Sequence, residues 1–283
     1  MTSSTDNLII ASLSCLPEKE KNSFLAAAFG KGDWAPRAAA LRHETVERPI
    51  IYVGAGTCGL AAGAGKTLEA VKAWLKKNKV KADVIEVGCI GYCAVEPLLD
   101  VRLPGMPRVS FERARAETVD AILNSIFTRR VPLKDNILGQ FAPEGAGKWA
   151  GVPLMSEHPF FKDQVRVVLK NCGLVNPVSI EEYIARGGYT SYLKALHGKT
   201  PAQVCQDVET SGLRGRGGGG FPTGKKWKMA LTSDADQKYI ICNADEGDPG
   251  AFMDRAVIEG DPHRVLEGLA IGAYAIHASK AYV

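Results

Sequence analysis

The chain has 283 residues, of which 46% are hydrophobic and 23% charged, and its formal net charge is +4. This length accommodates two compact domains, and the composition is that of an ordinary globular protein. Because the basic residues are scattered and form no stripe interleaved with aromatic side chains, the sequence does not indicate a nucleic-acid partner.

The sequence pattern indicates neither membrane insertion nor secretion. No apolar run approaches the roughly 20 residues that a helix needs to span a bilayer, and the N-terminal stretch MTSSTDNLIIASLS is too polar for a secretory signal. The seven cysteines are an odd number and most occur singly, which favours reduced thiols or metal ligands over a disulfide framework. We therefore expect a cytoplasmic protein without direct membrane insertion.

The N-terminal half predicts an extension followed by an α/β domain. Residues 1–45 are weakly patterned and are interpreted as an N-terminal extension with two short helices. From residue 46 the hydrophobic pattern alternates between strand and helix periods. The order of elements over residues 46–130 is strand, helix, strand, hairpin, helix, which is a thioredoxin-like order. The expected elements are helices over 23–29, 38–42, 67–79 and 117–127, strands over 49–53 and 82–87, and a hairpin within LLDVRLPGMPRVSFE.

The C-terminal half predicts a linker and a second α/β domain. Residues 131–155 are rich in Gly and Pro and are interpreted as the linker. The second domain is expected over residues 156–283, and we expect it to continue beyond Val283 because a strand-like segment has only begun there. Its expected elements are helices over 160–170, 180–196 and 262–277, a Gly-rich loop, GLRGRGGGGFPTGKKW, and a strand, YIIC, that leads into NADEGDPGAFMDR.

The stretch PIIYVGAGTCGLAAGAGKT allows more than one interpretation. A loop for a nucleoside triphosphate is excluded, because Leu60 stands where the motif requires a glycine. A Rossmann-type dinucleotide site fits better, since Gly54, Gly56 and Gly59 follow an apolar strand and Glu86 ends a second strand. The spacing to Glu86 is longer than usual, however, and a hairpin follows where a doubly wound sheet would continue with a helix.

An iron–sulfur site is the third interpretation. Cys58 lies in the loop after the first strand, and Cys89 and Cys93 lie in the loop after the second, so three thiolates can meet at one edge of the sheet. The segment GCIGYCAVEPLLDV resembles the thioredoxin-like [2Fe–2S] ferredoxin domains of complex I and NAD-linked hydrogenases. That resemblance places a fourth cysteine near Val53 or Gly54, where this chain has none.

Several outcomes are open for these cysteines. A non-cysteine group or Cys15 completes the cluster, or the domain has lost it. In the simplest alternative the three cysteines pack as small apolar residues.

The Gly-rich loop and the acidic turn after YIIC together predict a nucleotide site. Glycines allow successive backbone N–H groups to face phosphate oxygens, and Arg216 and Lys226 can add charge-assisted hydrogen bonds. The amide and carboxylates of NADEGDPG can bind ribityl or ribose hydroxyls.

The two motifs closely match the FMN- and NADH-binding subunit of complex I and its relatives in NAD-linked hydrogenases, formate dehydrogenases and electron-bifurcating enzymes. The resemblance covers about residues 155 to 283. It implies that this half is the N-terminal part of the FMN-binding α/β domain. The residues that it assigns to FMN are Gly215, Arg216, Gly217, Gly218, Lys226, Asn243, Asp245 and Glu246. Phe221 would stack on the adenine of NADH, and Asp248 would reach toward the nicotinamide nucleotide.

The chain also departs from these relatives. Gly219 replaces a commoner alanine, Asp248 replaces a commoner glutamate, and Met229 stands where complex I has a second aromatic residue. The relatives continue with a second flavin motif and a helical domain that holds a [4Fe–4S] cluster, for which this chain has no counterpart. Cys172, Cys205 and Cys242 lack the spacing for that cluster and are interpreted as structural.

We therefore predict a redox subunit of a multi-subunit NAD(H)-linked oxidoreductase, with FMN, NAD(H) and a [2Fe–2S] cluster as cofactors and other redox subunits as partners. FMN would carry the chemistry, so no side chain is expected to act as an acid or base. Two alternatives are a cofactor-free docking subunit of such a complex and a Rossmann-type flavoprotein built on the glycines of the opening stretch.

Overall fold

A computed structural model describes residues 9–283 except 10, 12, 15, 31 and 143–146. The described chain forms two compact units, each assembled from segments that are distant in sequence. We call Arg42–Ser179 with Gly250–Asp261 the sheet unit. We call the residues up to Leu41, Ile180–Pro249 and Pro262–Val283 the helical unit. Each unit is described by itself.

The sheet unit contains a five-stranded mixed sheet in the order β2-β1-β3-β4-β5. The neighbours β1 and β2 are parallel, whereas β3 is antiparallel to β1 and to β4. This arrangement confirms the thioredoxin-like order predicted from the sequence and contradicts a doubly wound sheet. The strands are β1 (Ile50–Gly54), β2 (Asp83–Val87), β3 (Leu99–Arg102), β4 (Arg108–Phe111) and β5 (Ile137–Phe141).

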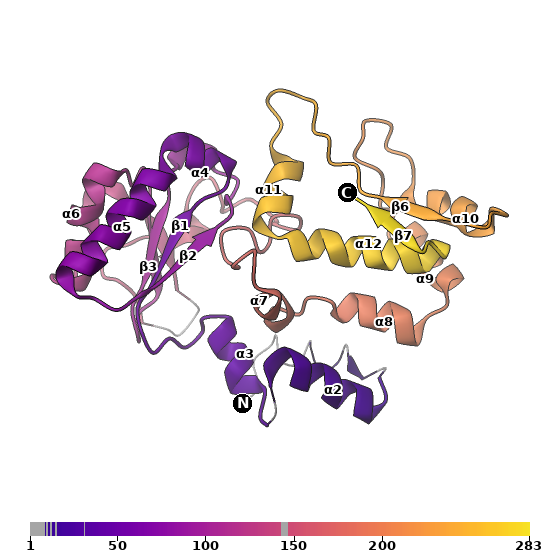
Figure 1. The fold of residues 1–283 in the computed structure, drawn as a ribbon. Coiled ribbons are helices and arrows are strands. Elements are labelled where there is room, and N and C mark those ends of the chain that lie inside the picture. The colour runs from indigo at the N-terminus through magenta and orange to yellow at the C-terminus, as the bar shows by residue number, and fades with distance from the viewer. Residues whose placement is uncertain (1–8, 10, 12, 15, 31, 143–146) are drawn as a thin grey trace. The chain divides into compact units, whose positions relative to one another are not determined.

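Two long helices cover one face of this sheet (Figure 1). Apolar residues recur along each of them on one side, so Val71, Trp74 and Ile122 are buried against the strands. The indole N–H of Trp74 donates to Asn124 Oδ1 at 3.3 Å. The helices of the unit are α4 (Thr57–Ala62), α5 (Ala64–Asn78), α6 (Ala116–Phe127) and α11 (Met253–Gly260), with short 3-10 turns η1 (Cys93–Val95), η2 (Lys134–Asn136) and η3 (Met155–Glu157).

Part of the range predicted as a linker belongs to this sheet. Strand β5 lies within 131–155 and pairs antiparallel with β4. The buried Gln140 amide donates to the backbone oxygens of Trp149 and Val152 and accepts from the N–H of Trp149. These bonds hold Trp149 and Val152 against β5. The Gly and Pro content of the range therefore marks tight turns, and the domain division drawn there stays a prediction.

The helix predicted over 160–170 is wrong, because the described residues there form turns. Phe160 stacks on Tyr92 with ring centroids 4.0 Å apart. The Arg166 guanidinium donates to the backbone oxygens of Ile90 and Leu169. Long-range packing onto the loop after β2 replaces the local helical hydrogen bonds in this segment.

The helical unit contains seven described helices and a two-stranded parallel sheet, β6 with β7. The strand predicted at YIIC is confirmed as β6. The elements are α2 (Glu18–Phe29), α3 (Ala35–Leu41), α7 (Ile180–Ala185), α8 (Thr190–Gly198), α9 (Pro201–Thr210), α10 (Thr223–Thr232), α12 (Pro262–Ile276), β6 (Tyr239–Ile241) and β7 (Lys280–Tyr282).

The single helix predicted over 180–196 is interrupted. Gly187 has φ +88° and Tyr189 has φ +60°, so the backbone leaves the helical region between α7 and α8. The buried Glu267 carboxylate stabilises the break. It accepts hydrogen bonds from the Tyr183 hydroxyl and from the backbone N–H of Tyr189.

Among the described helices, none is long and apolar enough to cross a membrane.

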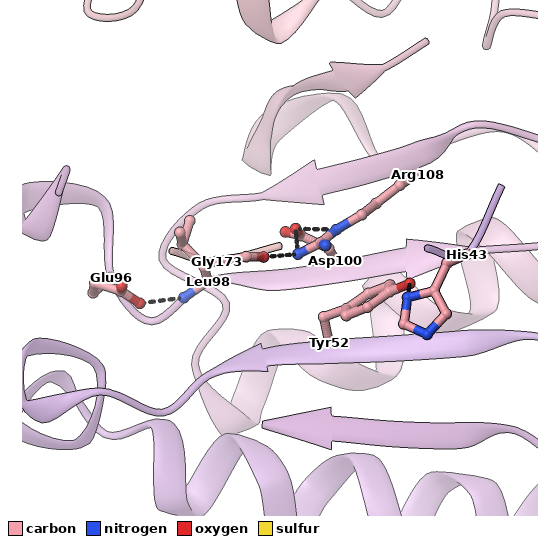
Figure 2. Close-up of polar contacts among 7 residues, drawn as sticks. All are labelled: His43, Tyr52, Glu96, Leu98, Asp100, Arg108 and Gly173. Carbon is pink, nitrogen blue, oxygen red and sulfur yellow. Dashed lines mark hydrogen bonds and ion pairs between the residues drawn. The ribbon is translucent and has the colours of Figure 1, made fainter. Parts of the chain in front are cut away.

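A buried ion pair joins β3 and β4 on the sheet (Figure 2). The Arg108 guanidinium donates to Asp100 at 2.6 Å and to the backbone oxygen of Gly173 at 2.7 Å. It also lies over the Tyr52 ring, 3.7 Å from the centroid, and the Tyr52 hydroxyl bonds His43 Nδ1. The pair therefore links two strands to the segment before α7.

We predict that Asp100→Ala destabilises the protein by about 3–5 kcal/mol, because it leaves the Arg108 charge buried without its carboxylate. The exposed pair Arg48–Asp83 is the control, and Arg48→Ala should cost no more than about 1 kcal/mol. Urea unfolding followed by tryptophan fluorescence gives both values. Equal losses for the two variants would contradict this account of the pair.

Candidate metal centre and nucleotide-binding loops

Three cysteines converge at the edge of the sheet where β1 and β2 end. Cys58 lies in the first turn of α4, Cys89 follows β2, and Cys93 begins η1. Their Sγ atoms lie within 4.8 Å of one another. The distance from Cys58 to Cys93 is 3.0 Å, and that from Cys89 to Cys93 is 3.8 Å. The sequence prediction that two loops bring these residues to one point is confirmed.

The parallel pairing of β1 and β2 produces this convergence, because parallel neighbours end at the same edge. The backbone N–H of Ala55 donates to Val87 O at 2.9 Å and continues the pairing into the two loops. The loop after β2 then turns at Gly91, whose φ is +88°. The N–H of Gly91 donates to Cys89 Sγ at 3.3 Å and orients that thiol.

The glycines of the opening stretch serve this packing. A Cβ at Gly59 would lie 2.0 Å from Gly54 O, and one at Gly56 would lie 3.2 Å from the backbone N of Cys89. Either substitution would separate α4 from β1 or from the loop of Cys89. The pattern of Gly54, Gly56 and Gly59 is therefore explained by close backbone contacts around the cysteines, without a dinucleotide.

Burial favours the protonated form of the Cys58 and Cys89 thiols. It raises the pKa of Cys58 to about 11, with a further contribution from Cys93. It raises the pKa of Cys89 still more strongly. Because a metal binds the thiolate, loading the site releases protons.

Glu96 is a residue near the thiols that sequence reasoning did not select. Its side chain is 6% exposed, and Oε2 accepts a hydrogen bond from the N–H of Leu98 at 2.8 Å (Figure 2). Burial raises the pKa of its carboxyl to about 7, while interactions with Leu98 and the Cys89 thiol act in the opposite direction. The one sequence signal for Glu96 was its position three residues after Cys93. A glutamate in a loop is too common for that position alone to indicate a ligand.

Helix α11 braces the first cysteine loop within the sheet unit. Glu259 accepts hydrogen bonds from the Thr57 N–H at 2.8 Å and from the Thr57 hydroxyl at 2.5 Å. At the end of α11, Gly260 lies against Gly88, so closely that a Cβ on Gly88 would be 2.3 Å from Gly260 Cα. The residue before Cys58 and the residue before Cys89 are thus both held by one helix.

The donor set fits an iron–sulfur cluster in three of its four positions. Cys15, which the sequence left as a possible fourth ligand, lies outside the described residues. Cys172 and Cys205 are buried and donate to the backbone oxygens of Ala256 and Ala275, which agrees with their structural interpretation. Among the described cysteines, the three at the sheet edge are the ones grouped for metal binding.

The Gly-rich loop before α10 is an exposed hairpin. The N–H of Gly215 donates to Phe221 O at 2.9 Å, and the Arg214 guanidinium donates to Gly220 O at 2.6 Å. Gly218 has φ +92°, and a Cβ at Gly217, Gly218 or Gly219 would meet nothing within 4 Å. The positive φ accounts for the glycine at 218, whereas packing within the chain does not account for those at 217 and 219. The open space around them leaves the backbone accessible to a ligand.

The charged residues of this loop are available to a ligand. Arg216 and Lys226 are exposed, and neither forms an ion pair among the described residues. Lys226 lies in the first turn of α10, where the helix N-terminus also favours an anion. Phe221 is 50% exposed at the end of the loop, as a stacking residue would be.

The acidic turn follows β6 as a long irregular segment before α11 (Figure 1). Asn243 Oδ1 accepts from the N–H of Asp245 at 3.1 Å, and Glu246 adopts φ +43°. Asn243, Asp245 and Asp248 are exposed, and Glu246 is partly buried. The contacts named for the Gly-rich loop and for the acidic turn are formed within each loop. The predicted flavin residues thus lie on two separate loops of the helical unit.

The C-terminal segment is similar to proteins of known families. Residues 208–283 match the Nuo51 FMN-binding domain. This match confirms the resemblance predicted from the two motifs. The NADP-reducing hydrogenase subunit HndC of Solidesulfovibrio fructosivorans is 59% identical over 122 residues, 43% of this chain and 24% of that protein. An NADH-quinone oxidoreductase subunit of Rhizobium meliloti (strain 1021) is 49% identical over 117 residues, 41% of this chain and 28% of that protein. The chain thus spans about a quarter of these relatives.

Two solved structures are also similar. A thioredoxin-like [2Fe–2S] ferredoxin from Aquifex aeolicus aligns with 36% of this chain and 100% of its own, at 16% identity and a TM-score of 0.29. An NAD+-reducing [NiFe]-hydrogenase in the air-oxidized state aligns with 98% of this chain and 44% of its own, at 22% identity and a TM-score of 0.32.

We predict that Gly88→Ala destabilises the protein by about 1–3 kcal/mol, because the new Cβ forces Gly260 away from the cysteine loop. Gly65→Ala is the matched control. Nothing lies within 4 Å of a Cβ there, so the variant should gain up to about 1 kcal/mol through helix propensity. Urea unfolding measures both, and a neutral Gly88→Ala would show that α11 does not brace this loop.

Proposed function

We propose that this chain is part of a redox subunit of a multi-subunit NAD(H)-linked oxidoreductase. In this proposal it holds a [2Fe–2S] cluster in the sheet unit and contributes half of an FMN site from the helical unit. The observation that carries the proposal is the joint occurrence of the cysteine group and the segment that matches the Nuo51 FMN-binding domain.

The cluster is held by Cys58, Cys89 and Cys93. When bound, FMN supplies the conversion between two-electron and one-electron chemistry, and the cluster supplies one-electron transfer. The thiolates bind iron, and the N–H of Gly91 fixes the orientation of Cys89. The half-buried position of Cys58 and the buried position of Cys89 limit contact with water.

The flavin residues act by binding and orienting. Backbone N–H groups of Gly217 and Gly218 would bind the phosphate, and Arg216 and Lys226 would neutralise its charge. Gly215 would shape the loop, because its N–H is bonded to Phe221 O. The residues Asn243, Asp245 and Glu246 hold hydroxyl groups, while Phe221 and Asp248 contact NADH. No residue in either loop is required to move a proton.

The proposed partners are other redox subunits of a hetero-oligomeric complex, since both relatives named above are hydrogenase or quinone-oxidoreductase subunits. We also propose a cytoplasmic location. All six described cysteines are free thiols, as is usual in a reducing compartment.

We predict that anaerobic reconstitution gives about two irons and two sulfides per chain, and that Cys58→Ser loses more than half of this iron. Cys242→Ser, in the helical unit, is the control and should retain it. Iron and sulfide analysis with electron paramagnetic resonance of the reduced samples measures the result. A wild-type chain without iron would favour the cofactor-free docking subunit.

We also predict that Arg216→Gln weakens FMN binding tenfold or more, because it removes a charge-assisted hydrogen bond to phosphate. Lys76→Gln, an exposed charge change on α5, should leave the affinity unchanged. Quenching of FMN fluorescence by the chain gives both dissociation constants. The same constant for Arg216→Gln and wild type would remove this loop from the flavin site.

A further inference from the structure

A buried carboxylate lies beside the three thiols. Glu96 Oε2 is held by the N–H of Leu98, whereas Oε1 is buried and has no hydrogen-bond partner among the described residues. A buried carboxylate oxygen without a partner is costly, so native structures provide one from protein, water or a bound ion. This oxygen therefore marks a place where a ligand group is expected.

Gly54 shows which space the carboxylate fills. A Cβ built on Gly54 would lie 2.7 Å from Glu96 Oε2 and 3.3 Å from Oε1. A Cβ on Gly59, the residue after Cys58, would lie 3.3 Å from the same Oε2. The end of β1 and the first turn of α4 thus close around the carboxylate, and any side chain at position 54 would compete with it.

The carboxylate also lies close to both cysteine loops. Glu96 follows Cys93 by three residues, directly after η1, and its Oε2 lies against Gly59, the neighbour of Cys58. The potential iron ligands are therefore three sulfurs, whose Sγ atoms lie within 4.8 Å of one another, and one carboxylate oxygen from the residue after η1.

We propose that Glu96 Oε1 is the fourth protein ligand of the iron–sulfur cluster. The inference rests on the cluster proposed above. The carboxylate oxygen donates an electron pair to iron, its proton leaves to solvent, and neither partner changes oxidation state. Carboxylates are common iron ligands, and the hydrogen bond from Leu98 to the other oxygen orients the group.

Three variants test the ligand directly under anaerobic reconstitution. Glu96→Ala should lower the iron content at least twofold. Glu96→Gln keeps an acceptor for the Leu98 N–H and should lose iron equally without loss of stability in urea. Glu86→Ala, at an exposed glutamate on β2, is the matched control and should retain wild-type iron.

A rescue variant separates ligation from a structural role. With the carboxylate removed, a cysteine at position 54 can extend into the vacated space, so Gly54→Cys with Glu96→Ala should restore the iron. Its visible absorption should show stronger sulfur-to-iron charge transfer than wild type, because four thiolates replace three. Restored iron with that spectrum supports the proposal.

The possible failures are distinguishable. Full iron and an unchanged paramagnetic resonance signal in Glu96→Ala and Glu96→Gln, with iron lost in Cys58→Ser, would leave the cluster in place and overturn the role of Glu96. Absence of iron from the wild-type chain would overturn the cluster itself. Failure of the rescue variant to regain iron would show that position 54 and Glu96 do not share a ligand space.

Discussion

The parallel pairing of β1 with β2 is the constraint on which the candidate metal centre depends. Both strands end at one edge, so the loops that carry Cys58, Cys89 and Cys93 meet there without a long excursion of the chain. Close backbone contacts then bring α4 against the strand ends. A side chain at Gly56 or Gly59 would push these parts away from one another.

Helix α11, which follows the predicted flavin motif in the sequence, contacts the loop of Cys58 at this edge. Helix α11 begins at Met253, five residues after Asp248, and its Glu259 bonds the Thr57 backbone in the sheet unit. The motif predicted to contact FMN is therefore joined through a short segment to a helix that braces a cysteine loop.

Sequence patterns predicted the parts of the fold that depend on interactions between residues close in sequence. The apolar face that contains Val71 and Trp74 predicted α5, and the order of strands and turns predicted the sheet except β5. The sequence missed α4, because a six-residue segment with a glycine at its centre has weak helix propensity. It also predicted a helix over 160–170, where contacts with the distant loop after β2 prevail over the local pattern.

The candidate site likewise combines features that local sequence predicts with features that depend on long-range contacts. The spacing of the cysteines predicted their convergence, which depends on strand order alone. Glu96 was missed because its significance comes from two long-range facts: its burial and its overlap with the space of a side chain on Gly54. The flavin motifs were recognised by their residues, and the segment that contains them matches the Nuo51 FMN-binding domain.

Mössbauer spectroscopy of the chain reconstituted with ⁵⁷Fe tests the central claim most directly. A cluster held by three thiolates and one carboxylate predicts two iron sites of equal area, diamagnetic when oxidised, with one of them carrying a harder ligand than the other. A single mononuclear iron site, two irons with equivalent all-sulfur surroundings, or no bound iron would contradict it.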